Sequence, residues 1–234
     1  MKDEIAVLIP AYNEEKNIGI LVSKLKKNYS SVIVVDDGST DRTNLYAREN
    51  GAVVLSHPAC RGKGEALKTG FMHVMENNIA AVVTLDGDGQ HPVEDIPGFE
   101  KAYRRNKRAG VWVGKRRIKG TKMPLIRRMT NMSMSVFISF LAGQWIPDTQ
   151  CGFRLIKREV ISAVKLNTSH FETESELLIK ASWKGFAISS VCISTVYDDE
   201  KSKIRPLTDT KRFFIMLASI IFPPLLRLKR SKNR

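Results

Sequence analysis

The sequence predicts an α/β domain built on a mostly parallel β-sheet with helices on both faces. Short β-branched runs alternate with helical patterns along the first half of the chain, which is typical of parallel strands joined by crossover helices. Polar clusters follow three of the predicted strands, at the ends where sheets of this class bind their ligands. Together these observations place a ligand site at the carboxyl edge of the sheet.

The predicted elements of the first half follow one another in a regular order. The strands are 5–9, 32–35, 52–55, 80–85 and 111–114, and the helices between them are 14–27, 41–49, 62–76 and 92–104. The helix at 14–27 shows the reason for such assignments, because Ile18, Leu21, Val22 and Leu25 have the spacing of one apolar helix face. The second half is less regular, with helices at 124–142 and 174–184, a polar turn at 148–154 and one or two strands within 186–196.

The composition is that of a globular protein with a strongly basic surface. Of 234 residues 43% are hydrophobic, and 38 Lys and Arg stand against 24 Asp and Glu, a formal net charge of +14. Such a charge attracts phosphorylated small molecules, nucleic acid or an anionic membrane, and does not choose among them. Three scattered cysteines and an N-terminal apolar run too short for a signal peptide predict a cytoplasmic protein.

No stretch of the sequence reaches the roughly 18–20 apolar residues of a transmembrane helix. Two segments come partway. The first, 129–147, is interrupted by polar residues, and the second, 213–226, is interrupted by Pro223-Pro224. Segments of this kind are more often buried or interfacial than membrane-spanning.

The stretch VTLDGDGQHP (83–92) ends an apolar strand in two aspartates separated by a glycine. Alternate residues at a strand end turn the carboxylates of Asp86 and Asp88 toward one point. Hard cations such as Mg²⁺ bind through one or two carboxylates together with substrate phosphates. Gly87 and Gly89 remove side chains where a ligand has to approach. A polar turn that caps the next helix is the alternative interpretation.

A second acidic cluster follows the strand at 32–35. Asp36 and Asp37 precede a Gly-Ser-Thr-Asp segment, part of which has the composition of a helix cap. Two consecutive carboxylates exceed what a cap needs, and an acidic residue at such a place accepts hydrogen bonds from ribose hydroxyls or a base edge. The turn RGKG (61–64) is similar to a phosphate loop without the full Walker pattern, so a solvated turn is equally compatible with it.

Seven short motifs then appear in one order along the chain. They are PAYNEE (10–15), VVDDGSTD (34–41), RGKGEALKTGF (61–71), LDGDGQHP (85–92), VGKR (113–116), DTQCGFR (148–154) and ESELLIKA (174–181). In this order they resemble the family 2 glycosyltransferases of GT-A fold, and most closely the polyprenyl-phosphate sugar synthases of the dolichyl-phosphate mannose type. The resemblance covers about residues 3–205 and implies a Rossmann-like catalytic domain over 1–206, followed by an apolar helix and basic tail over 207–234.

The resemblance implies roles for individual residues by position. Nucleotide binding is implied for Pro10, Tyr12, Glu14, Asp36 and Asp37, with Lys63 in the phosphate-loop-like turn. Metal and diphosphate binding is implied for Asp86, Asp88 and Gln90, with Mg²⁺ or Mn²⁺ as the cofactor. A basic active-site residue is implied at Arg116. Lipid-phosphate contacts are implied at Arg127 and Asn131, with Arg128 as a substitute by register. The acceptor side is implied to be lined by Asp148, Gln150 and Arg154, with Lys180 and Lys203 as further phosphate contacts.

The implied reaction moves a sugar from a nucleoside diphosphate to an acceptor oxygen with inversion at the anomeric carbon. A metal ion at Asp88, supported by Asp86, neutralises charge on the departing diphosphate, and Arg116 adds fixed positive charge. A polyprenyl-phosphate acceptor needs no general base, because a phosphate monoester is ionised near neutral pH (second pKa about 6). A hydroxyl acceptor needs one, and Asp148 is then the candidate.

The tail of the chain adds a physical argument for a lipid acceptor. Residues 213–222 are apolar almost all round a helix, so this segment has to be buried in protein or in lipid. Lys211 and Arg212 precede it and five basic residues follow within 227–234. Each basic residue near an anionic leaflet contributes about 1 kcal/mol. We therefore expect a protein bound peripherally to the cytoplasmic face of a membrane by an interfacial helix, the alternative being a helix packed on the domain or on a partner chain.

Three other functions are less compatible with the sequence. A sugar nucleotidyltransferase should carry a Gly-rich basic loop directly after the first strand, where this chain has PAYNEE. A nucleic-acid-binding protein should carry a basic stripe with stacking aromatics, whereas the sheet edge here is acidic, so no nucleic-acid partner is expected. A silent scaffold would not need intact Asp86, Asp88 and Gln90. The sugar, the nucleobase and the oligomeric state stay open.

Overall fold

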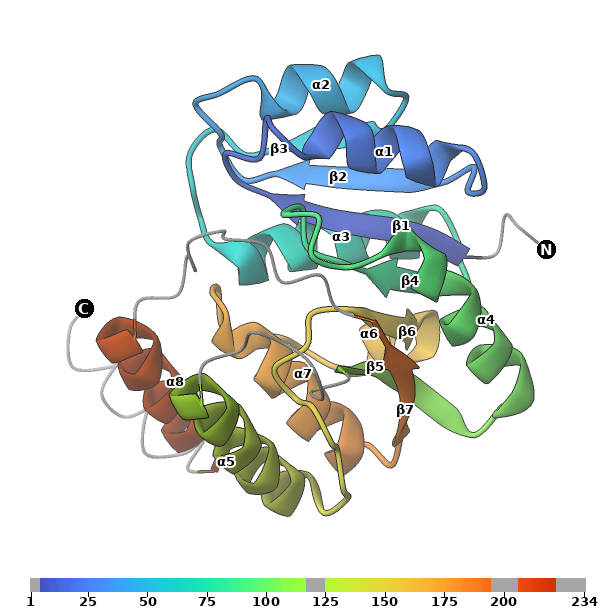
Figure 1. Cartoon of the computed structure of the whole chain (residues 1–234). Helices are drawn as coiled ribbons and strands as arrows, with labels where there is room; N and C mark the ends of the chain where they lie inside the picture. Colours follow the sequence, from blue (N-terminus) through green and yellow to red (C-terminus); the bar gives the residue numbers. More distant parts are fainter. Residues whose placement is uncertain (1–4, 117–124, 195–205, 222–234) are drawn as a thin grey trace.

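The computed structural model describes residues 5–116, 125–194 and 206–221, and within these the side chains of 125–127, 206 and 207 are not described. At its centre lies one seven-stranded sheet with the strand order β3-β2-β1-β4-β6-β5-β7 (Figure 1). The strands are β1 (Ile5–Ala11), β2 (Val32–Asp36), β3 (Val53–Ser56), β4 (Ala81–Thr84), β5 (Ala109–Arg116), β6 (Arg154–Lys157) and β7 (Ala187–Ile193). Among these seven, β6 alone runs antiparallel to its neighbours. The predicted α/β fold is therefore confirmed.

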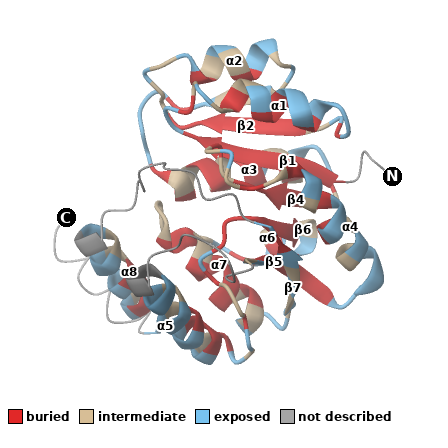
Figure 2. Cartoon of the chain, in the orientation of Figure 1, coloured by how far each residue is buried: buried red, intermediate tan, exposed pale blue. Residues whose placement is uncertain are grey.

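Helices cover both faces of this sheet. They are α1 (Ile18–Lys26), α2 (Thr43–Glu49), α3 (Lys63–Glu76), α4 (Ile96–Arg105), α5 (Leu125–Ala142), α6 (Arg158–Ala163), α7 (Glu172–Trp183) and α8 (Pro206–Ile221), with a 3-10 turn η2 (Val93–Asp95) before α4. Helix α3 packs on β1 and β2, and α6 packs on α3. Every residue of β1 and β2 is buried (Figure 2), as expected for parallel strands covered on both sides.

Two elements are missing from the sequence prediction. A polar turn was expected at 148–154, but Arg154 already begins β6, and α6 follows it directly. Only four residues form β6, too few to show a period in the sequence. Its strand conformation comes from hydrogen bonding to β4 on one side and β5 on the other, with Leu155 and Ile156 buried between the layers.

Three helices of the second half form a layer outside the sheet. Helix α7 packs against α5 and α8, and these contacts enclose a small apolar cluster. The cluster consists of Ile138, Ile179, Phe213, Met216 and Leu217. One side of helix α8 therefore packs against the domain. None of the helices in the described ranges is long and apolar enough to cross a bilayer.

Candidate active site

The carboxyl ends of β1, β2 and β4 meet at one edge of the sheet. Ala11 at the end of β1 is aligned with Asp36 at the end of β2, and Thr84 at the end of β4 is aligned with Leu8. The polar segments that follow these strands therefore leave the sheet side by side, as the sequence predicted.

Hydrogen bonds tie the first two of these segments together. Asn13 has φ of 53°, a left-handed conformation that Asn tolerates better than most residues. Its backbone N–H donates to Ser39 Oγ (2.9 Å), and its side-chain oxygen accepts from the backbone N–H of Thr40 (2.9 Å). In addition, the Glu14 N–H donates to Thr43 Oγ1 (2.7 Å). The PAYNEE and DDGSTD motifs thus form one connected surface.

Asp37 is buried at the centre of this surface. Its carboxylate accepts from His57 Nδ1 (2.7 Å) and from the backbone N–H groups of Arg61 (2.9 Å) and Gly62 (2.7 Å). The Cys60 thiol lies 3.3 Å away as a weaker donor. Burial by itself would raise the pKa of Asp37, but these hydrogen bonds lower the pKa below its usual value. Asp37 therefore carries a stable negative charge that organises the loop before α3.

Asp36 and Glu14 lie beside Asp37 and are also largely buried. Asp36 accepts from the Ser39 N–H (3.0 Å) and from Asn44 Nδ2 (2.9 Å). Glu14 lies against Gly87, where an added Cβ would come within 3.3 Å of Glu14 Cγ. The structure therefore brings Glu14 next to the DGDG segment. Pro10 belongs to the same end of β1, and Tyr12 is exposed just beyond it.

Lys63, the first residue of α3, lies between two carboxylates. Its Nζ is 2.6 Å from Asp86 Oδ1 and 2.9 Å from Glu174 Oε2. Burial would lower the pKa of Lys63, but the two carboxylates outweigh it and raise the pKa above its usual value. Burial would likewise raise the pKa of Asp86, whereas Lys63 and His91 hold it well below its usual range. This ion cluster joins α3, the end of β4 and α7.

Gly152 supplies the space for the ion cluster. A Cβ on this residue would lie 2.9 Å from Asp86 Oδ2 and 3.0 Å from Lys63 Nζ. His91 closes the other side, with Nε2 at 3.4 Å from Asp86 Oδ2 and its ring against Phe153. The DGDGQHP and DTQCGFR motifs, far apart in the sequence, are therefore in contact.

Asp86, Asp88 and Gln90 fit a divalent cation by the chemistry of their donor atoms. All three offer oxygen ligands, which Mg²⁺ and Mn²⁺ prefer. The two described cations of the ion cluster, Lys63 and Arg154, are both engaged by carboxylates, with Arg154 Nη2 3.9 Å from Glu174 Oε1. Among the described residues no three His, Cys, Asp or Glu side chains are grouped as a complete metal cage. A cation here would take its remaining ligands from Gln90, water or a bound phosphate.

Arg116, at the end of β5, forms a bidentate ion pair with Asp148. Its Nε lies 2.7 Å from Asp148 Oδ2 and its Nη2 lies 2.8 Å from Oδ1. Both side chains are mostly shielded from solvent. The pairing fixes the plane of the guanidinium at the mouth of the carboxyl edge and engages both oxygens of the proposed base.

Two other predicted residues are held by backbone and carboxylate groups. Arg154 is buried, and its guanidinium donates to the carbonyl oxygens of Cys151 (2.8 Å), Thr149 (2.9 Å) and Glu174 (2.7 Å). It therefore holds the 148–154 loop from inside, next to the end of β4, and its Nη2 lies 3.9 Å from Glu174 Oε1 in the ion cluster. Lys180 pairs with Glu176 and donates to the Lys165 carbonyl oxygen (2.8 Å), on a later turn of α7.

The remaining predicted residues are Gln150, Asn131, Arg128, Arg127 and Lys203, of which three belong to α5. Gln150, two residues after Asp148 in the sequence, is exposed, and Asn131 is half-buried on α5. Arg128 is exposed on the same helix. Arg127 belongs to α5 but its side chain lies outside the described residues, and so does Lys203 entirely.

Three residues of the site were not expected from the sequence. His57 is the side-chain partner of Asp37, and Glu174 is the second carboxylate on Lys63. Glu176 is fully buried and accepts the N–H groups of Asn167 and Thr168. Glu174 and Glu176 belong to the ESELLIKA motif. His57 carries no local signal, because its partner is distant in the sequence.

Comparison with known proteins places the chain in a family. A model described as "Glycosyl transferase family 2" matches residues 6–164, more than half of the chain. The chain belongs to glycosyl transferase family 2. As a family 2 glycosyltransferase it is 32% identical over 252 residues to a UDP-N-acetylglucosamine–dolichyl-phosphate N-acetylglucosaminyltransferase of Methanococcus voltae, covering 97% of both chains. It is 30% identical over 229 residues to a dolichyl-phosphate hexose transferase of Haloferax volcanii, again covering 97% of both.

Solved structures of the same fold exist. The family 2 glycosyltransferase described here superimposes on glucosyl-3-phosphoglycerate synthase of Mycobacterium tuberculosis, in its complex with Mn²⁺, uridine diphosphate and glucosyl-3-phosphoglycerate, with a TM-score of 0.72. The match covers 93% of this chain and 79% of that one at 21% identity. This level of identity supports the GT-A-like fold alone.

Proposed function

We propose that this protein transfers a sugar, with inversion, from a nucleotide-sugar donor to a polyprenyl phosphate. The observation that carries the proposal is the ion cluster at the carboxyl edge, where Asp86 and Glu174 engage the Lys63 ammonium and Arg154 Nη2 also lies 3.9 Å from Glu174 Oε1, so that both cations are already paired. An anionic diphosphate cannot bind such a surface without additional positive charge. A divalent cation together with a nucleoside diphosphate satisfies both requirements.

The donor would bind across the ends of β1, β2 and β4. Pro10, Tyr12 and Glu14 would hold the nucleoside together with Asp36 and Asp37. Asp86, Asp88 and Gln90 would hold Mg²⁺ or Mn²⁺, which when bound neutralises charge on the departing diphosphate. Lys63 is the nearest described cation to this place and would contact the diphosphate or the sugar.

The state of Asp148 favours a phosphate acceptor over a hydroxyl. A hydroxyl acceptor needs a carboxylate with a free oxygen to take its proton. Both oxygens of Asp148 are held by Arg116 within 2.8 Å. A phosphate monoester is ionised near neutral pH (second pKa about 6) and needs no such base. In this proposal Asp148 orients Arg116, and Arg116 faces the anionic reactants. The relatives from Methanococcus and Haloferax, whose names specify dolichyl phosphate, support the same acceptor class.

The acceptor would be reached in a membrane that contacts the protein through α5 and α8. Helix α5 exposes a stripe at helical spacing, with Met132 62% and Phe140 80% exposed. Helix α8 exposes Phe214 (59%) and Ile215 beside it. The rings of Phe137 and Phe213, 6.2 Å apart, show that the two helices are neighbours.

The polar surroundings of this apolar face favour an anionic lipid surface as its partner. Arg128 and Lys211 are exposed on the same two helices, and the residues after α8 include five Lys or Arg. Trp145, near the end of α5, is 64% exposed, and Trp is enriched where proteins meet the lipid headgroup region. Two copies of a chain with net charge +14 repel each other, whereas an anionic bilayer attracts it.

The test is a transfer assay with defined substrates. Purified protein would be incubated with Mn²⁺, a panel of labelled nucleotide sugars and a short-chain polyprenyl phosphate, and label would be counted after extraction into organic solvent. We expect metal-dependent label in the organic phase, lost in Asp88→Asn and retained in Glu49→Gln, a control on the exposed face of α2. Label that moves only to a neutral polyprenol or a soluble glycan would refute the phosphate acceptor. Binding of every nucleotide sugar without transfer to any acceptor would refute the enzymatic proposal.

A further inference from the structure

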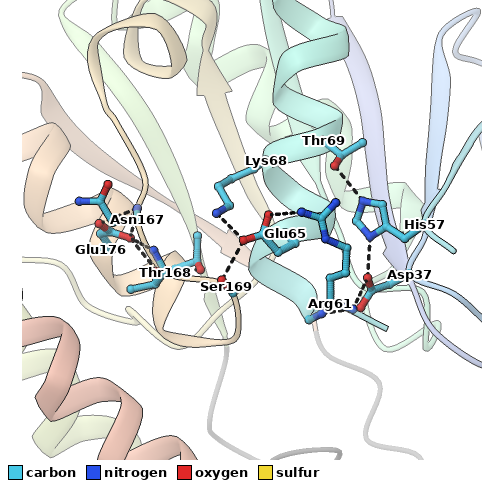
Figure 3. Close-up of polar contacts among 12 residues, drawn as sticks. Asp37, His57, Arg61, Glu65, Lys68, Thr69, Asn167, Thr168, Ser169 and Glu176 are labelled. Atoms are coloured by element: carbon cyan, nitrogen blue, oxygen red, sulfur yellow. Dashed lines mark hydrogen bonds and ion pairs between the residues drawn. The ribbon is translucent and has the colours of Figure 1, made fainter. Parts of the chain in front are cut away.

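The first turn of α3, which carries Lys63, is held from two sides by buried carboxylates (Figure 3). One support comes from the first half of the chain through Asp37. The other comes from the second half through the loop at 165–170. We call these two supports together the α3 anchor.

On the first side, Asp37 fixes the backbone just before Lys63. Its two oxygens accept the N–H groups of Arg61 and Gly62, at 2.9 Å and 2.7 Å. His57, from the end of β3, donates from Nδ1 to the same carboxylate at 2.7 Å. Because an ionised carboxylate only accepts hydrogen bonds, the proton of the His57 ring must be on Nδ1. His57 therefore supplies a hydrogen-bond donor to the buried carboxylate that holds the loop.

The His57 ring is itself held in place. Its Nε2 lies 2.9 Å from Thr69 Oγ1, one and a half turns along α3. The ring is 8% exposed. With Nδ1 directed at Asp37, the second ring nitrogen is within hydrogen-bond distance of the Thr69 hydroxyl. A continuous chain of hydrogen bonds runs from Thr69 on α3 through His57 and Asp37 to the backbone amides of Arg61 and Gly62, just before α3 (Figure 3).

On the second side, Glu65 in the first turn of α3 is bound to Ser169. Its backbone N–H donates to the Ser169 carbonyl oxygen (3.1 Å), and its carboxylate accepts from Ser169 Oγ (2.8 Å). The 165–170 loop is in turn fixed by Glu176, which accepts the N–H groups of Asn167 and Thr168 at 3.0 Å.

The backbone at Gly62 leaves little freedom between the two supports. Gly62 has φ of 103°, and a Cβ there would lie 2.5 Å from the Ser169 carbonyl oxygen. Gly64 is as tightly packed, with a Cβ position 2.0 Å from Thr173 Oγ1. The position of Lys63, between these glycines, is therefore set by the anchor. Its Nζ reaches Asp86 and Glu174 only because the backbone is fixed where it is.

We propose that His57 is a positioning residue of the donor site, which acts through Asp37 and the Arg61–Gly62 backbone to hold the Lys63 ammonium between Asp86 and Glu174. The consequence for catalysis rests on the proposed function, since it assumes that Lys63 contacts the donor. The positional claim does not rest on it.

Two variants of His57 separate the contacts of its ring. His57→Asn places an amide N–H where Nδ1 lies and keeps the donor to Asp37. In His57→Gln the side-chain amide lies near the position of Nε2, so this variant keeps only the contact with Thr69. Both are polar replacements of similar size, and Thr69→Val removes the outer contact alone. Circular dichroism would establish that each variant is folded before it is compared.

The first measurement needs no substrate. Unliganded protein would be treated with an acetylating reagent at fixed pH, and the rate of modification of Lys63 would be measured by peptide mass spectrometry against exposed Lys27. In the wild-type protein Lys63 should react slowly, because its Nζ is engaged by two carboxylates. We expect at least about a fivefold faster reaction in His57→Gln, and a rate within twofold of wild type in His57→Asn and Thr69→Val. Equal rates in His57→Gln and His57→Asn would overturn the positional claim.

The second measurement uses the transfer reaction. We expect His57→Gln to raise KM for the nucleotide sugar about tenfold, with kcat and the KM for the acceptor within twofold of wild type. His57→Asn should restore the donor KM. An increase in acceptor KM in place of donor KM would refute the link to the donor. If Lys63 becomes reactive in His57→Gln but the wild-type protein transfers no sugar to any acceptor, the positioning role stands and the proposed function fails.

Discussion

The Lys63 ammonium lies 2.6 Å from Asp86 Oδ1, and this contact joins α3 to the segment after β4 at the candidate active site. Lys63 is the first residue of α3, whereas Asp86 follows the end of β4. Glu174, on α7, completes the cluster from the second half at 2.9 Å. The cluster is therefore both a structural joint and the most highly charged part of the site.

Replacing Lys63 with Met should destabilise the fold as well as abolish transfer. The change removes the ammonium that Asp86 and Glu174 share and leaves only His91 beside Asp86 and Arg154 beside Glu174. Removing one partner of a buried ion pair costs about 3 kcal/mol or more. We expect a loss of about that size in the free energy of unfolding, measured by urea denaturation. Lys68→Met is the control, because Lys68 pairs with the single carboxylate of Glu65 one turn away on the same helix, and an ion pair of this spacing contributes about 0.2–0.5 kcal/mol. Equal losses in the two variants would contradict the role assigned to the cluster.

The charge of Asp37 should make stability depend on pH in the acidic range. Its pKa is lower in the folded protein than in the unfolded chain, so its contribution is fully present above the unfolded pKa of about 4 and is lost as pH falls through the folded pKa. We expect Asp37→Asn to be less stable than wild type by about 1–3 kcal/mol at pH 7. The difference should shrink below about pH 4. Urea denaturation of both proteins at pH 7, 5 and 3.5 measures it, and a difference that stays constant over this range would show that Asp37 is not stabilised as an anion.

Arg116 and Asp148 should behave as one unit. A lysine at position 116 cannot reproduce the two parallel hydrogen bonds, so we expect Arg116→Lys to lower kcat about 10–100-fold. Asp148→Asn should lower kcat to a similar degree, and the double variant should be little worse than either single one. Lys115→Gln, on the same strand with an exposed side chain, should retain activity. If Asp148→Asn instead removes the acidic limb of the pH–rate profile while Arg116→Lys does not, Asp148 acts as a base and the acceptor is a hydroxyl.

The apolar face of α5 and α8 should bind vesicles that contain anionic lipid. We expect Phe140→Glu and Phe214→Glu each to reduce cosedimentation with such vesicles at least tenfold, because a charged side chain at the interface opposes burial of that face. Ile20→Glu is a matched control, since Ile20 is 63% exposed on α1, away from this face. Unchanged binding in both Phe variants would exclude the α5–α8 face as the membrane contact.

The sequence was sufficient to predict the elements whose conformation is determined by residues close together in the chain. The first four strands and the helices that join them show clear apolar periods, and their polar ends predicted the edge at which Asp36, Asp37, Asp86 and Asp88 gather. The motifs also predicted the family, which the comparisons confirm. The roles assigned to individual residues stay predictions.

The elements that the sequence did not predict depend on distant partners. Strand β6 is too short to carry a period and owes its conformation to β4 and β5. Arg154 stands in a polar motif that suggested an exposed loop, but its guanidinium satisfies buried carbonyl oxygens. His57 was overlooked because nothing near it in the sequence indicates that Asp37, twenty positions earlier, is its partner.

The position of β6 also governs the order in which the chain can complete its fold. Strand β6 follows both β4 and β5 in the sequence but bonds to both in the sheet. Until residues 154–157 have been synthesised, no strand connects β4 and β5 by hydrogen bonds. The part of the sheet with the order β3-β2-β1-β4 then ends at an unpaired edge on β4. An open edge of this kind is a template for pairing with other chains. Synthesis therefore passes through an aggregation-prone interval that closes only when β6 inserts, and a chain terminated before residue 154 cannot form the complete sheet.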